Sequence, residues 1–281
     1  MHRIGVFVYG VLSYACFFAT FLYAVGFIGG FGVPHSIDSA AEGPLATAVL
    51  VDVLLLAIFA LQHSVMARPA FKRWWTSIVP EPAERSTYVL ASSVALLFLF
   101  WQWRPIGGLV WRVEQPVVAA ALYGLFAAGW LTVLVTTFLI NHFDLFGLRQ
   151  VWFHLRGEPY RPLGFVTPGP YRHVRHPLYV GWLLAFWATP TMTAAHLLFA
   201  VLTTAYILIA IRLEERDLVE FHGERYAEYR RRRPDVGAPS PGEAAGSYEG
   251  GADRDGLRDG RPRMPLVMSS DPKGEEPCRS L

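Results

Sequence analysis

Long apolar runs separated by short polar segments occupy most of the first 211 residues of the chain. A membrane-spanning helix needs roughly 20 mostly apolar residues. Four runs approach or exceed that length, at residues 4–31, 45–61, 88–103 and 117–140. The pattern therefore predicts four transmembrane helices, the second of which carries Asp52 within it.

A fifth apolar run, residues 178–211, is too long for one ordinary crossing and is interrupted at Thr189-Pro190. Proline breaks a helix because it lacks a backbone N–H and clashes with the preceding turn. We therefore expect a helical hairpin whose first helix is short. Such a hairpin returns Arg212 to the side of the membrane on which Arg175 lies.

The loops between these runs differ in charge. Residues 63–85 contain four Lys or Arg and residues 141–175 contain five Arg, whereas residues 32–44 contain neither Lys nor Arg. Loops rich in Lys and Arg stay on the cytoplasmic side of a membrane. We therefore predict an integral, multi-pass membrane protein with both termini cytoplasmic.

Composition supports a membrane protein, because hydrophobic residues make up 53% of the chain and charged residues 17%. The net charge of +2 gives no case for nucleic-acid binding. Cys16 and Cys278 show no metal-ligand spacing, so we expect no metal site. Residues 1–234 are predicted to form one all-α, polytopic membrane helix bundle. Residues 235–281 have few large apolar side chains and are predicted to be a disordered tail.

Polar chemistry gathers at both ends of the fifth run. At the start of this run, the stretch from Gly169 to Gly181 contains several arginines, histidines and tyrosines. Just after the run, residues 212–218 contain two glutamates and two arginines. Two explanations without a ligand stay open: the first stretch is an ordinary basic loop, or Glu215 pairs with a loop arginine. Carboxylates, arginines and aromatic rings at a membrane edge also suit a ligand with groups of both charges. S-adenosylmethionine is such a ligand, since aromatic faces attract its sulfonium.

These residues resemble a known superfamily. The stretch Gly169 to Gly181, followed by Glu214-Glu215-x-x-Leu218 and Gly223-x-x-Tyr226-x-x-Tyr229, is similar to the isoprenylcysteine carboxyl methyltransferases. His222 stands where that pattern often has Phe, and we treat it as a tolerated variant. The resemblance implies a cytoplasmic-side S-adenosylmethionine site formed by Tyr171, Arg175, His176, Pro177, Tyr179, Gly181, Glu214 and Glu215, with Tyr226 and Tyr229 as supports.

The N-terminal half narrows the resemblance. Residues 61–68, 74–88 and 141–149 look like those of the methanethiol S-methyltransferases, bacterial relatives that also resemble the NnrU membrane proteins. This resemblance covers about residues 1–234 and implies methylation of methanethiol to dimethyl sulfide. A thiol must ionise to react, and His63, His142 and Asp144 are candidate bases at the cytoplasmic ends of the second and fourth spans. The alternative is that they cap helices or pair within the bundle.

Other functions stay open at this point. The acceptor could be a prenylated cysteine carboxylate or another lipid. A reductase is a further alternative, because sterol reductases carry a similar C-terminal motif, although the paired Glu214-Glu215 fits methyltransferases better. A non-enzymatic membrane protein is the third. The expected partners are the lipid bilayer and a small thiol.

Overall fold

The computed structural model describes residues 3–40, 43–163, 169–172, 174–223 and 230–231 of the chain. Tyr226, Tyr229 and the predicted tail at 235–281 lie outside the described residues. Helices account for most of the described chain, with one small sheet. The elements in order are α1 (Arg3–Gly29), α2 (Leu45–Ala67), α3 (Pro69–Trp75), the short 3₁₀ helix η1 (Glu81–Ala83), α4 (Glu84–Gln102), β1 (Leu109–Arg112), α5 (Pro116–Ile140), α6 (His142–Leu145), α7 (Leu148–Arg156), the 3₁₀ helix η2 (Gly169–Arg172), α8 (Pro177–Trp187), β2 (Thr191–Thr193) and α9 (Ala194–His222).

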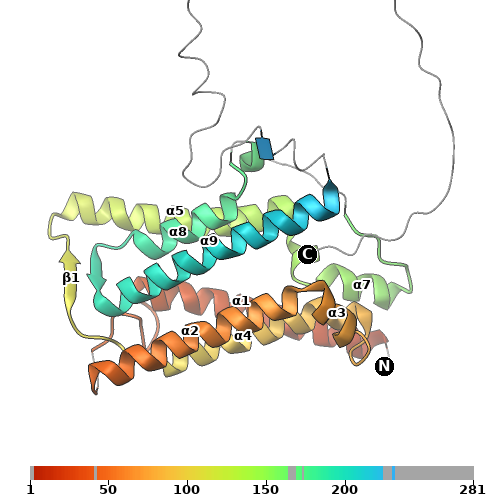
Figure 1. The fold of residues 1–281 in the computed structure, drawn as a ribbon, viewed down its shortest axis with the longest axis horizontal. Helices are drawn as coiled ribbons and strands as arrows, with labels where there is room; N and C mark the ends of the chain where they lie inside the picture. The colour runs from red at the N-terminus through yellow and green to blue at the C-terminus, as the bar shows by residue number, and fades with distance from the viewer. Residues whose placement is uncertain (1–2, 41–42, 164–168, 173, 224–229, 232–281) are drawn as a thin grey trace, which may run out of the picture.

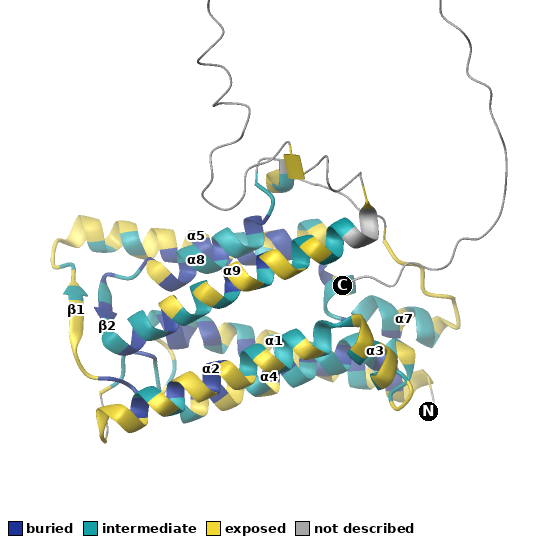
Figure 2. Ribbon diagram, in the orientation of Figure 1, coloured by how far each residue is buried: buried dark blue, intermediate teal, exposed yellow. Residues whose placement is uncertain are grey.

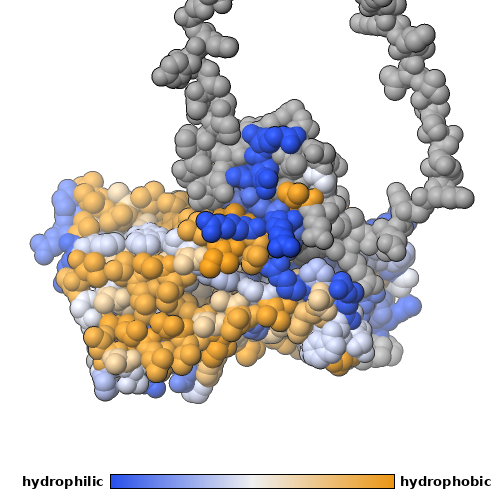
Figure 3. All heavy atoms as spheres, viewed as in Figure 1, coloured by the Kyte–Doolittle hydropathy of each residue, from blue (hydrophilic) through white to orange (hydrophobic). Residues whose placement is uncertain are grey.

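Five helical segments of the described chain are long and apolar enough to cross a membrane: α1, α2, η1 with α4, α5, and most of α9. Their outward faces carry large apolar side chains such as Leu12, Val117 and Leu131. Figure 3 shows this hydrophobic surface over the long helices, which is the exterior that a lipid environment requires. The chain is therefore an integral, multi-pass membrane helix bundle, as predicted.

The long helices form two layers. Figure 1 shows α1, α2 and α4 in one layer and α5, α8 and α9 in the other, and α4 packs against both α1 and α2. Buried residues gather on the faces where helices meet, as Figure 2 shows. Aromatic rings join the layers: Phe21 of α1 meets Trp130 of α5 edge to face at 5.2 Å between ring centroids. Such packing fixes the two layers against each other.

The predicted hairpin is confirmed. Helix α8 ends at Trp187, Pro190 follows, and α9 begins at Ala194. The turn is more elaborate than expected, because β2 pairs antiparallel with β1 and places Thr193 opposite Leu109. Strands of three and four residues are too short to show a periodic pattern, so the sequence did not predict this ribbon.

Two glycines let α8 lie close to α5. A Cβ added at Gly129 would stand 2.6 Å from the Ala185 nitrogen, and one added at Gly181 would stand 2.9 Å from the Gly129 oxygen. Small residues allow the backbones of membrane helices to approach closely. The start of α8 is thus held against the middle of α5.

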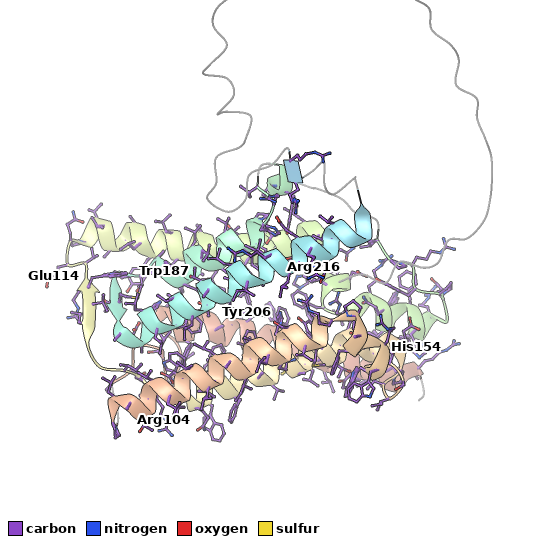
Figure 4. All side chains as sticks on the ribbon, in the orientation of Figure 1. Arg104, Glu114, His154, Trp187, Tyr206 and Arg216 are labelled. Atoms are coloured by element: carbon purple, nitrogen blue, oxygen red, sulfur yellow. The ribbon has the colours of Figure 1, made fainter. Side chains whose placement is uncertain are left out.

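One end of the bundle collects most of the basic residues, whereas Arg104 (Figure 4) and Arg112 of β1 lie at the other. The start of α1, helices α3 and α7, and the end of α9 lie at this end, and the β1–β2 ribbon lies at the other (Figure 1). Both basic loops and Arg212 are therefore on one side, as the hairpin requires. Which side of the membrane this is stays a prediction.

Two helices extend further toward this basic end than predicted. Helix α2 continues to Ala67 instead of stopping near Leu61, and α4 begins at Glu84 instead of Tyr88. The added turns carry polar side chains, and some of these are paired with another helix: the Gln62 amide donates to the Ser92 hydroxyl at 3.3 Å. Because pairing removes the cost of burying polar groups, the helices need not end where the apolar pattern ends.

Candidate functional site

The stretch that precedes α8 meets the end of α9. The Arg175 Nη1 donates to the Glu215 Oε1 at 2.5 Å, and the His176 Nε2 donates to the same oxygen at 3.2 Å. Only 10% of the Arg175 side chain and 12% of the Glu215 side chain are exposed. The ion pair that the sequence left open as an alternative is thus formed, in a largely buried setting where charges have to be paired.

The neighbouring glutamate contacts the first turn of α8. The Tyr179 hydroxyl donates to the Glu214 Oε2 at 2.9 Å. Adjacent residues on a helix point about 100° apart. Glu214 and Glu215 therefore contact different residues, Glu214 the first turn of α8 and Glu215 the residues just before it. Pro177 is the first residue of α8, where proline is tolerated because that N–H has no helical partner. The proline thereby separates the residues that pair with Glu215 from the tyrosine that pairs with Glu214.

A second polar group lies between α2 and α4. The Tyr88 hydroxyl is 2.9 Å from His63 Nε2 and 3.1 Å from His63 Nδ1, and the Ser92 hydroxyl is 3.2 Å from Nδ1. Next to His63, the Ser64 and Tyr206 hydroxyls are hydrogen-bonded at 3.1 Å and join α2 to α9. Figure 4 shows Tyr206 on the side of α9 that faces α2.

The phenols of Tyr88, Tyr179 and Tyr206 are close enough to influence one another electrostatically. They come from α8, α9 and α4, so three helices contribute to one polar region. Sequence reasoning missed Tyr88 and Tyr206, because each stands within or beside an apolar run and resembles an ordinary membrane-span tyrosine. Tyr88 falls within the stretch 74–88 that carries part of the resemblance, which gave it no role, and Tyr206 lies in none of these stretches.

The structure places the other two predicted bases elsewhere. His142 is buried, with Nε2 bonded to the Tyr14 hydroxyl at 2.8 Å and Nδ1 bonded to the Thr137 hydroxyl at 2.8 Å. Burial lowers the pKa of His142, which favours its neutral form. Asp144 accepts from Arg149 at 3.2 Å and from Tyr160 at 2.9 Å. These partners come from α1, α5 and the region of α7, not from the α8–α9 hairpin.

The remaining predicted residues divide into three cases. Tyr171 lies in η2, ahead of the Arg175-His176 pair, and is half-buried. Gly181 lies in the contact with α5 described above. Tyr226 and Tyr229 lie outside the described residues. The structure thus joins Arg175, His176, Tyr179, Glu214 and Glu215 into one cluster, which we call the hairpin cluster.

A surface ion pair closes the same end of the bundle. Arg68 of α2 donates to Asp217 of α9 at 2.7 Å, and the two side chains are 37% and 38% exposed. Exposed pairs of this kind contribute little to stability, about 0–1 kcal/mol. The pair is useful as a comparison for the buried one on the same helix.

Comparison with known proteins gives the family. The phospholipid methyltransferase family model matches residues 117–225. The chain is 59% identical over 234 residues to a methanethiol S-methyltransferase of Crocosphaera subtropica, covering 83% of this chain and 92% of the relative. It is 54% identical to the enzyme of the same name from Mycobacterium tuberculosis, covering 82% and 95%.

More distant relatives also appear. Nurim of Mus musculus is 33% identical over 176 residues, which is 59% of this chain and 66% of that protein. No solved structure matches the chain. The part of this chain that matches the bacterial relatives is long enough to include both the hairpin cluster and the polar group between α2 and α4. At more than half identity over nearly the whole length of these relatives, the chain belongs to the methanethiol S-methyltransferase family.

Proposed function

We propose that the protein transfers a methyl group from S-adenosylmethionine to methanethiol and releases dimethyl sulfide. The observation that carries the proposal is the meeting of Arg175 and His176 with Glu215 across the α8–α9 hairpin. It is supported by relatives that bear the name methanethiol S-methyltransferase at 50–59% identity. The comparisons do not favour the prenylcysteine, reductase or non-enzymatic alternatives.

The hairpin cluster fits the chemistry of this methyl donor. A guanidinium such as Arg175 suits the carboxylate of an amino acid, and Glu214 and Glu215 suit an ammonium group or ribose hydroxyls. The rings of His176 and Tyr179 lie 5.6 Å apart between centroids and offer aromatic faces to a cation. The donor supplies a methyl group on positively charged sulfur, and we assign its binding to these five residues, with Tyr171, Pro177, Gly181, Tyr226 and Tyr229 as further candidates.

The direct test uses membranes that contain the chain. Methyl-labelled S-adenosylmethionine and methanethiol are supplied, and labelled dimethyl sulfide is measured in the gas phase. We expect product from the unmodified chain, strongly reduced product from Glu215→Gln, and normal product from Asp217→Asn, the exposed position on the same helix.

An acceptor competition separates the nearest alternative. A farnesylated cysteine analogue is offered together with methanethiol in the same membranes. Label in the prenyl ester and none in dimethyl sulfide would reject thiol methylation and favour a carboxyl methyltransferase.

A further inference from the structure

Methylation of a neutral thiol needs a place for the thiol proton. The thiolate is the nucleophile, and a cysteine thiol of pKa about 8.5 is mostly protonated at neutral pH. The sequence predicts three histidine or carboxylate groups for this purpose, His63, His142 and Asp144. The inference below rests on the proposed thiol methylation and asks which of them receives the proton.

Geometry favours His63. His142 is bonded to the Tyr14 and Thr137 hydroxyls at 2.8 Å and stacks on Phe138 at 4.1 Å between centroids, so its partners belong to α1 and α5. Asp144 is held by Arg149 and Tyr160 near α7. His63 alone of the three connects to the hairpin cluster, because Tyr88 contacts His63 and lies within electrostatic range of Tyr179.

The hydrogen-bond partners assign the proton on His63. The Ser92 hydroxyl oxygen already accepts from the Gln62 amide at 3.3 Å and can accept a second bond from the His63 Nδ1–H at 3.2 Å. That tautomer leaves Nε2 unprotonated, with the Tyr88 hydroxyl 2.9 Å from it and 3.1 Å from Nδ1. The tautomer is inferred from these partners, as ring protons in proteins generally are.

Tyr88 connects His63 to the region of the hairpin cluster. Its hydroxyl is bonded to His63, and its phenol interacts electrostatically with those of Tyr179 of α8 and Tyr206 of α9. The Tyr206 hydroxyl is bonded to Ser64, beside His63. The charged groups near it are Glu84 and Arg85 at the start of α4, and the Arg85 guanidinium lies 5.9 Å from the Tyr88 ring centroid. Arg85 also acts electrostatically on His63, so one cation lies near both Tyr88 and His63.

We propose that Tyr88 and His63 form a proton relay for the acceptor thiol, with Tyr88 touching the thiol and His63 receiving the proton. As the thiol sulfur forms its bond to the methyl carbon and the bond from that carbon to the donor sulfur breaks, the thiol proton passes to the Tyr88 oxygen. The Tyr88 proton passes to His63 Nε2. The positive charge of the donor sulfonium thus becomes an imidazolium, and the two sulfur products are neutral. The imidazolium then returns its proton to water.

The test compares two thiols of different acidity in the purified full chain. Methanethiol and the more acidic 2,2,2-trifluoroethanethiol are offered to the unmodified chain, Tyr88→Phe, His63→Gln and the control His154→Gln, which changes a histidine of α7 outside both polar groups (Figure 4). We expect Tyr88→Phe and His63→Gln to lower kcat/KM for methanethiol about 100- to 10,000-fold, the usual worth of general base catalysis. The acidic thiol should lose far less, because it ionises without help.

The dependence of the rate on pH distinguishes a proton relay from a purely structural role of Tyr88 and His63. Rates of both variants should follow the thiolate fraction of methanethiol as pH rises, whereas rates of the unmodified chain and of His154→Gln should level off at lower pH. Equal losses on both thiols with an unchanged profile would overturn the relay. So would loss of S-adenosylmethionine binding in both variants, measured by titration, because the two residues would then belong to the donor site.

Failure of the proposed function looks different. If the unmodified chain binds S-adenosylmethionine and methylates neither thiol at any pH, thiol methylation itself is wrong, and the relay is rejected with it.

Discussion

The buried pair of Arg175 and Glu215 allows a quantitative test of the donor site. Glu215→Gln keeps the shape of the side chain and removes its charge. The Glu215 Oε1 accepts two charge-assisted hydrogen bonds, from Arg175 at 2.5 Å and from His176 at 3.2 Å. A charge-assisted bond is worth about 1.5–3 kcal/mol and a neutral one about 0.5–1.5 kcal/mol. If the donor's ammonium group uses the same carboxylate, Glu215→Gln turns that contact into a neutral one, which costs about 1–1.5 kcal/mol, or roughly 5- to 12-fold in affinity.

A double-mutant cycle isolates the interaction. Titrations of S-adenosylmethionine are made with Arg175→Met, Glu215→Gln and the double variant, and Asp217→Asn is the matched control because its ion pair is 38% exposed on the Asp217 side. Contacting residues show coupling of about 0.5–3 kcal/mol, so the double variant should lose less than the two single losses combined. Additive losses, or an unchanged dissociation constant in Glu215→Gln, would refute the assignment of donor binding to this pair.

Three further predictions concern other parts of the chain. Gly129→Ala should lower the free energy of unfolding by about 1–3 kcal/mol, because its new Cβ would stand 2.6 Å from the Ala185 nitrogen; thermal melts can compare it with Gly124→Ala on the same helix, where nothing lies within 4 Å. Burial lowers the pKa of His142, so the unfolded state takes up more protons and stability should fall as pH drops below about 6.5; a melting series against pH should show a smaller fall in His142→Gln, and an equal fall would contradict this. Deleting all residues after Pro234 should leave dimethyl sulfide production intact, and a truncated chain that inserts normally but has lost turnover would show that the tail belongs to the site.

Much of the fold could be predicted because membrane helices leave a strong apolar pattern. The length of the run at 178–211, its interruption at Pro190 and the basic residues at both of its ends predicted the hairpin, and the hairpin brings Arg175 to Glu215. The pattern could not place the helix ends, since Gln62 and His63 look like residues leaving the membrane until Ser92 of a different helix is seen to pair with them.

The candidate site was predictable only in part. The chemistry of the hairpin cluster could be argued from carboxylates, arginine and aromatic rings, but its donor and acceptor came from resemblance. Tyr88 and Tyr206 could not be found, because a tyrosine in an apolar helix gains a role only from what faces it. The contact between Ser64 and Tyr206 joins residues 142 positions apart, and no local pattern encodes such a pairing.

The short length of α8 has a consequence for how the two substrates arrive. Its 11 residues extend about 16 Å, roughly half the thickness of a bilayer's hydrocarbon core. Its second turn packs at Gly181 against Val133, well before α5 ends at Ile140. The hairpin cluster therefore lies closer to the middle of the membrane than the ends of the neighbouring helices do. This places it near the boundary between lipid and water. A charged nucleoside donor has to come from the aqueous phase, whereas an uncharged thiol of one carbon dissolves in the lipid. The apparent KM for the thiol, expressed as its concentration in water, should then change with the partition coefficient of the surrounding membrane.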